Sequence, residues 1–103
     1  MNMADMPIVC TLGADALHAR REGLLADVLR RAEHRELTEH GLRMRFTSDT
    51  DTVATLARVV YAERQCCRFL RFVITVEPDA GAVLLELSGP AGTREFLAGL
   101  LDL

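Results

Sequence analysis

The 103-residue sequence contains no lysine and no tryptophan. All 12 basic residues are arginine, so no lysine amine is present for Schiff-base catalysis. Only 7 glycines and 3 prolines occur, which excludes a collagen-like or low-complexity chain. The net charge is only −3 and 50% of the residues are hydrophobic, which excludes intrinsic disorder. These absences leave a compact domain with a hydrophobic core.

Long hydrophobic runs are also absent, so the sequence predicts no transmembrane helix. Residues 1–6 include an acid and lack the basic and apolar regions of a secretory signal, so we expect a flexible start rather than a signal. Acidic residues outnumber basic ones by 15 to 12 and aromatics are only 5%, which disfavours nucleic-acid binding. The sequence therefore predicts one domain over residues 1–103, with no nucleic-acid or membrane partner.

Cysteine is scarce, with three residues at Cys10, Cys66 and Cys67. An odd number without a signal peptide argues against a disulfide scaffold. A reducing, cytoplasmic compartment fits better. In such a compartment, a cluster of cysteines points to metal or redox chemistry.

Hydrophobic periodicity predicts eight elements. A strand is expected over residues 7–12 and a helix over 13–31. An edge strand over 35–39 and a strand over 42–47 follow, and Ser48 with Asp51 resembles a capping box that opens a second helix. This helix ends near residue 66 or 67. Strands over 70–77 and 83–87 flank a turn at 78–81, and a last helix begins at Gly89-Pro90.

This order predicts an α+β fold. We expect a two-layer sandwich in which helices cover one face of a mostly antiparallel sheet. The first six elements have the ferredoxin-like order β-α-β-β-α-β, and a C-terminal strand and helix are added to them. Because this architecture hosts many activities, function must be argued from particular residues.

The most informative residue is Glu63, which falls on the predicted core face of the second helix. That face is spaced by steps of three and four residues, through Val53, Leu56, Val60, Glu63 and Cys67. A carboxylate on a core face is costly unless it is paired, hydrogen-bonded, protonated or bound to metal. Cys66 and Cys67 follow within one turn, so an oxygen ligand lies beside two sulfurs.

Two interpretations of this segment are open. In a structural one, the cysteines pack as small hydrophobes and Glu63 pairs with Arg64, Arg68 or Arg71. In a functional one, Cys10, Cys66 and Cys67 bind a soft metal ion, with Glu63 as ligand and the three arginines around it. Adding Glu63, His18 or His34 would give a mixed set of the zinc type. Adjacent cysteines reach one ion only where the helix ends.

The segment Glu63-Arg64-Gln65-Cys66-Cys67-Arg68-Phe69-Leu70 resembles a motif of small uncharacterised bacterial proteins. Those proteins share an E-x-x-C-C-x-F-[LF]-x-F core and a C-terminal G-P-x-G-x-x-x-F-L, which residues 89–97 also match. The motif is similar to a segment appended to regulators of the mercury-resistance type. The resemblance implies soft-metal or thiol chemistry. From these residues we expect no DNA-binding portion, so we do not expect the chain to be such a regulator.

Three functions follow from these residues. The leading hypothesis is a cytoplasmic thiol-site domain that binds a soft or borderline metal for sensing, sequestration or resistance. The second is an enzyme with Cys66 or Cys67 as nucleophile and Glu63 as base. The third is a protein-interaction domain whose cysteines are only core. A homodimer is also expected, because the C-terminal helix ends in many apolar residues.

Overall fold

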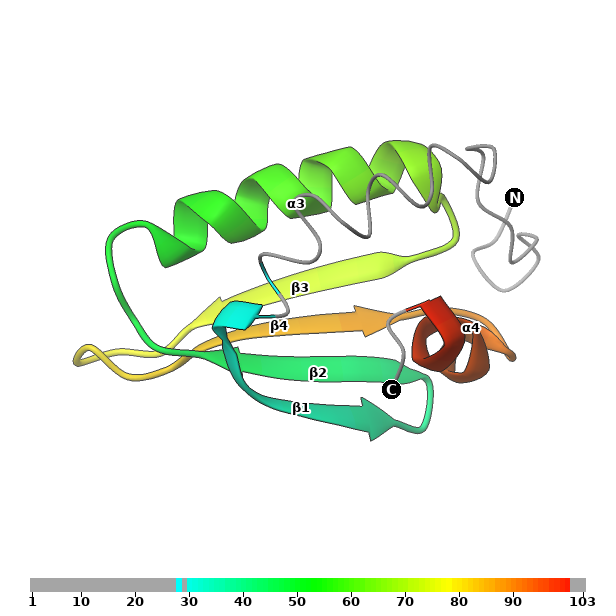
Figure 1. The fold of residues 1–103 in the computed structure, drawn as a ribbon, viewed down its shortest axis with the longest axis horizontal. Coiled ribbons are helices and arrows are strands. Elements are labelled where there is room, and N and C mark those ends of the chain that lie inside the picture. The colour runs from blue at the N-terminus through cyan, green and yellow to red at the C-terminus, as the bar shows by residue number, and fades with distance from the viewer. Residues whose placement is uncertain (1–27, 29, 101–103) are drawn as a thin grey trace.

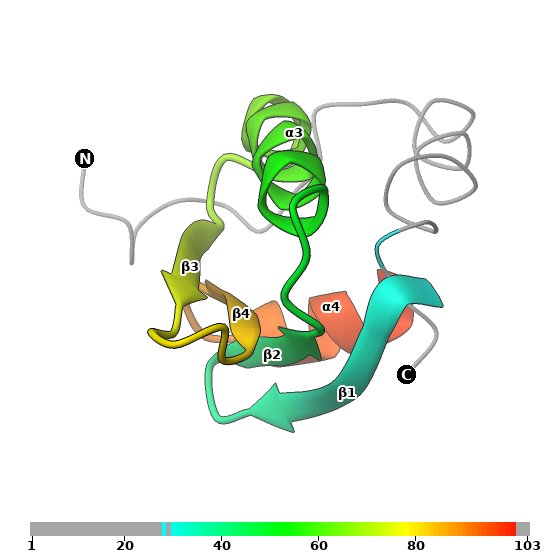
Figure 2. The ribbon, with the colours of Figure 1, turned by 90° about the vertical axis from the view of Figure 1, so that its left-hand side faces the viewer.

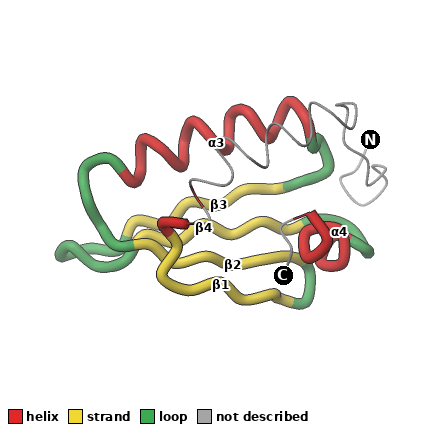
Figure 3. The backbone as a smooth tube through the Cα atoms, in the orientation of Figure 1, coloured by secondary structure: helices red, strands yellow, loops and turns green. Residues whose placement is uncertain are grey.

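The structure is a computed structural model that describes residues 28 and 30–100. Its elements, in chain order, are β1 (Ala32–Thr38), β2 (Gly41–Phe46), α3 (Thr52–Cys66), β3 (Arg71–Val76), β4 (Val83–Ser88) and α4 (Thr93–Leu100). Figures 1 and 3 show α3 along one side of the sheet and α4 at the end where β4 finishes. Of the helix expected over 13–31, residues 28, 30 and 31 are described, and they are helical. The strand expected over 7–12 and the start at 1–6 lie outside the described residues.

The four strands form an antiparallel sheet with the order β1-β2-β4-β3, which confirms the α+β class. The ferredoxin-like order is not what this sheet shows. That order would put the strand over 7–12 between β2 and β3, and β4 occupies this place instead. The physical reason is the short turn after β3, which folds β4 back beside it. β4 then carries its buried Val83, Leu85 and Leu87 between two strands.

The sheet has one apolar and one charged face, as the alternation in the sequence predicts. In β2, Leu42, Met44 and Phe46 are at most 1% exposed, and each lies opposite a buried residue of β4. These side chains form the core together with residues of both helices. On the other face, Arg43 binds Glu86 and Glu36 at 3.0 and 3.1 Å. Figure 2 shows α3 lying over the concave side of the twisted sheet.

Helix α4 begins later than the sequence predicts. Gly92 has a φ of 98°, which an α-helix does not contain, so the helix starts at Thr93 rather than at Gly89-Pro90. Thr93 is fully buried, and its hydroxyl donates to the Pro90 carbonyl oxygen at 2.7 Å. Phe96 meets the buried ring of Phe69 edge-on, with centroids 5.2 Å apart, which ties α4 to the loop that follows α3.

The turn between β3 and β4 contains a strained alanine. Asp79 and Ala80 have φ values of 62° and 58°, and the Gly81 N–H donates to the Pro78 carbonyl oxygen at 3.1 Å. Two central residues with positive φ define a type I′ turn, the kind that matches the twist of a hairpin. Glycine suits the second central position, whereas a residue with a Cβ atom is strained there.

Ala80→Gly is therefore expected to raise the free energy of unfolding by about 0.5–1 kcal/mol, because the strain is released in a turn that is otherwise unchanged. Urea denaturation followed by circular dichroism measures this. Ala82→Gly is the matched control, since Ala82 lies in the same loop without a positive φ. An equal or lower midpoint for Ala80→Gly would contradict the turn assignment.

Candidate thiol site at the end of helix α3

Helix α3 begins at a cap that differs from the predicted one. The Asp49 carboxylate accepts hydrogen bonds from the backbone N–H groups of Asp51 and Thr52, both at 2.9 Å. Asp49 thus takes the capping role that the sequence assigned to Ser48 and Asp51. A hydrogen bond with the Thr52 side chain, followed by the backbone bonds from Thr52 and Asp51, lowers the pKa of Asp49.

A polar cluster at the start of α3, consisting of Arg31, Asp51, Thr55 and Arg58, was missed from the sequence. Arg31 binds the Asp51 carboxylate at 3.0 Å, and the buried Thr55 hydroxyl donates to the same carboxylate at 3.2 Å. The hydrogen bond from Arg31, followed by that from Thr55, lowers the pKa of Asp51. Asp51 and Thr55 are four residues apart, and this spacing in a helix indicates that their side chains can interact.

These lowered pKa values predict acid sensitivity. A carboxylate with a lowered pKa in the folded state stabilises the fold above the ordinary aspartate pKa of about 3.9, and this contribution is lost as the pH falls below that value. The urea midpoint is therefore expected to fall as the pH drops below about 4. Asp51→Asn keeps an acceptor for Thr55 and removes the charge facing Arg31, so it should flatten this dependence. Identical pH profiles for the two proteins would contradict the prediction.

The far end of α3 carries the candidate site, because Glu63 faces the core there. Glu63 is 5% exposed and Cys67 is fully buried, as the sequence predicts. The predicted core face needs one correction. Val53 is 38% exposed, and Val59, at 3%, is buried in its place, because the buried face starts at Thr52 rather than at Val53.

The helix ends where the thiol site requires it to end. The Cys67 N–H donates to the Glu63 carbonyl oxygen at 2.7 Å and closes the last turn, and the backbone of Cys67 then leaves the helical conformation at φ −116° and ψ 79°. Cys67 carries a thiol rather than a disulfide. Both Glu63 and Cys67 make interactions within the folded chain. The side chain of Cys66 and all of Cys10 lie outside the described residues, so the proximity of the three sulfurs stays a prediction.

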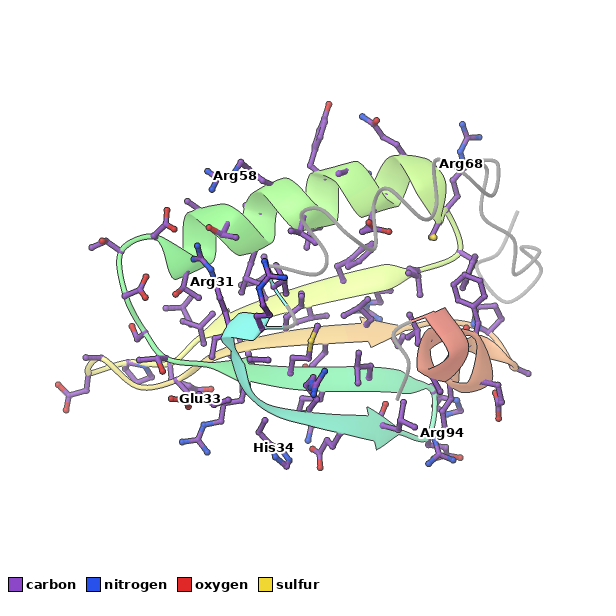
Figure 4. The ribbon with its side chains drawn as sticks, in the orientation of Figure 1. Arg31, Glu33, His34, Arg58, Arg68 and Arg94 are labelled. Carbon is purple, nitrogen blue, oxygen red and sulfur yellow. The ribbon has the colours of Figure 1, made fainter. Side chains whose placement is uncertain are left out.

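The three arginines expected around the site are all exposed. Figure 4 shows Arg68 pointing away from the sheet, whereas Cys67 is fully buried. Arg64 and Arg68, with Tyr61 and Gln65, line a hollow of about 350 Å³ on the outer side of α3. A larger hollow of about 560 Å³ lies near the start of α3, beside Asp49 and Asp51. Neither hollow is lined by Glu63 or Cys67.

Among residues 28 and 30–100, no group of three histidine, cysteine, aspartate or glutamate side chains is placed to hold a metal ion. The predicted alternative ligand His34 is 65% exposed on β1, and Figure 4 shows it at the opposite edge of the molecule from Arg68. A metal at the end of α3 would therefore need Cys66 or Cys10 in addition to Glu63 and Cys67. His18 also lies outside the described residues.

Comparison with known proteins finds no family, no curated protein and no solved structure that matches this chain. Across the described part of the chain, neither helix is long and apolar enough to span a membrane. The functional argument therefore rests on the residues of this chain alone.

Proposed function

We propose that the end of α3 is a thiol site that binds a soft or borderline metal ion, with Cys66, Cys67 and Cys10 as sulfur ligands. The observation that carries the proposal is the burial of Glu63, at 5% exposure, one helical turn from the fully buried Cys67. Glu63 and Cys67 together offer a carboxylate oxygen and a sulfur on one side of the helix end, and both are donor types that bind borderline metal ions. Thiolate sulfur selects soft and borderline metals such as Cd²⁺, Hg²⁺, Cu⁺ and Zn²⁺.

In this proposal, Glu63 is either a ligand or a neighbour that holds a thiolate ligand in place. Carboxylates beside metal ligands fix the orientation of the ligands and tune their basicity. The arginines Arg64, Arg68 and Arg71 lie in the same segment, but their side chains are exposed, so they would favour a thiolate only at a cysteine that faces them. The domain would act in a reducing, cytoplasmic compartment, where these thiols stay available for metal.

The burial of Cys67 favours metal binding over nucleophilic catalysis at that residue. A nucleophile must reach its substrate, and the Cys67 side chain has no exposed surface. Structural metal sites have the opposite requirement, because their ligands are closed off from solvent. The homodimer stays a prediction, which sedimentation at tens of micromolar protein would check.

Native mass spectrometry of the reduced chain with Cd²⁺ tests the proposed function. We expect one Cd²⁺ per chain, and loss of that ion in Cys66→Ser and Cys67→Ser. Cys67→Ala is a second variant at the buried position, because it leaves no unmatched hydroxyl in the core. His34→Gln is the control for adventitious surface binding and should leave the stoichiometry unchanged. Cd²⁺ binding that survives both cysteine substitutions would overturn the proposal.

A further inference from the structure

The two edges of the described sheet differ in how they are protected. β3 lies at one edge and β1 at the other. After Arg71, β3 contains neither a charge nor a proline, and Val73 and Val76 are 36% and 57% exposed. β1 instead carries four consecutive exposed residues that are charged or titratable, Glu33, His34, Arg35 and Glu36. Charged edges resist further strand pairing, whereas an apolar edge is a site for it. Of the two edges of the described sheet, the edge of β3 is therefore the one that is open to a partner strand.

We propose that residues 7–12 of the same chain pair with the open edge of β3 in antiparallel orientation. This segment reads Pro-Ile-Val-Cys-Thr-Leu, which is apolar and rich in β-branched residues. It is the one strand predicted from the sequence that lies outside the described residues. The central position that a ferredoxin-like order would give it is taken by β4.

The direction of the segment follows from the strands it must join. β1 and β4 run one way, and β2 and β3 run the other. Residues 28, 30 and 31 are helical and lead directly into β1, and the fully buried Val28 belongs to the same core as α3. A strand that returns to β1 through a helix has the direction of β1. Residues 7–12 would therefore run antiparallel to β3.

The handedness of the connection selects β3 over β1. The connection from β2 through α3 to β3 is right-handed, as Figures 1 and 2 show. Consider a connection that starts outside β3, passes through a helix on the same face of the sheet and ends at β1. Compared with the β2–α3–β3 connection, its strands run in the opposite direction and it moves across the sheet in the opposite direction. These two reversals cancel, so this connection is also right-handed. Placing the segment outside β1 would give a left-handed connection, which proteins almost never use.

The chain length also fits. A strand of six residues spans about 20 Å, and about 13 helical residues return that distance. Residues 13–31 number 19, so about six remain beside the 13 helical ones to connect the strand to the helix and the helix to β1. In extended conformation, six residues reach about 20 Å. From a strand outside β3 to β1 there are four strand spacings, which amount to about 19 Å. The crossing can therefore pass the end of α3 rather than cut across the helix.

This pairing would bring Cys10 to the end of the sheet that holds Cys66 and Cys67. In the antiparallel arrangement, the end of the 7–12 strand lies beside the start of β3 at Arg71, four residues after Cys67. Cys10 precedes that end by two residues. The assignment of Cys10 as a ligand rests on the proposed function, whereas the strand pairing itself does not.

Amide hydrogen exchange and nuclear Overhauser effects in the full, metal-free chain test the pairing. We expect contacts between residues 8–11 and 72–75, and protection of the β3 amides that point away from β4. The outward amides of β1 are an internal control and should exchange rapidly. Val9→Pro removes a donor from the proposed strand, so it should speed exchange of the outward β3 amides at least about tenfold. Ala4→Pro, outside the proposed strand, should not.

Outward β3 amides that exchange as fast as those of β1 would overturn the inference. So would protection that grows with protein concentration and survives Val9→Pro, because a second copy would then cover the edge. If the Val9→Pro variant does not fold, the test is whether the unsubstituted chain shows the contacts between residues 8–11 and 72–75, and their absence would overturn the inference. Addition of Cd²⁺ separates the two proposals. Contacts without Cd²⁺ binding would refute only the thiol function, whereas Cd²⁺ binding without contacts would refute only the pairing.

Discussion

Gly41→Ala is expected to destabilise the protein by about 3 kcal/mol or more, because the added methyl group would overlap a neighbouring strand. A Cβ atom on Gly41 would lie 1.8 Å from the Leu87 carbonyl oxygen and 2.8 Å from its carbon. Both atoms belong to the backbone of β4, which pairs with β2 on one side and β3 on the other. The strand cannot move aside without breaking the pairing at the centre of the sheet. Total stabilities of small domains are about 5–15 kcal/mol, so this substitution removes a large part.

Gly99→Ala is the matched control for this prediction. Gly99 lies on α4 with open space where a Cβ atom would be added. Alanine is preferred over glycine inside a helix, so this variant should gain about 0.5–1 kcal/mol. Urea denaturation of both variants gives the comparison. A Gly41→Ala protein as stable as the unsubstituted chain would contradict the pairing of β2 with β4.

Glu63→Gln is expected to weaken Cd²⁺ binding by about 10–100-fold, because it keeps the shape of the side chain and removes its charge beside the thiols. Without metal, the variant should be as stable as the unsubstituted chain or more so, since a buried charge is gone. Competition with a chromogenic chelator measures the affinity, and urea denaturation measures the stability. Glu95→Gln, at an exposed position on α4, is the matched control and should change neither.

The opposite pattern would identify Glu63 as a structural ion-pair partner. Removal of one member of a buried pair costs about 3–5 kcal/mol. Metal affinity would then be unchanged. A variant unchanged in both measurements would contradict the central role given to this residue.

Local structure was largely predictable because it depends on local patterns. The alternation over residues 42–47 and 70–77 predicted β2 and β3, since each strand carries one apolar face in a half-buried sheet. The turn at 78–81 followed from its residue types. The strand order was not predictable in this way. The place of β4 between β2 and β3 depends on pairing between segments far apart in the sequence, which periodicity does not encode.

At the candidate site, too, the features that depend on local spacing were predictable. The spacing from Leu56 to Cys67 placed Glu63 on the core face, and its burial confirms that prediction. The backbone conformation of Gly92 and the capping by Asp49 were missed, because several nearby residues offer equally good signals. Whether Cys66 and Cys10 join Cys67 stays a prediction, which the pairing of residues 7–12 with β3 addresses.

The most direct test of the thiol site is the X-ray absorption spectrum of the chain loaded with one equivalent of Zn²⁺. Zinc–sulfur bonds are about 2.3 Å long, whereas bonds to nitrogen or oxygen are about 2.0–2.2 Å. A site built from Cys66, Cys67 and Cys10 predicts a zinc shell dominated by sulfur, which Cys67→Ala should diminish. A shell of nitrogen and oxygen alone would contradict it.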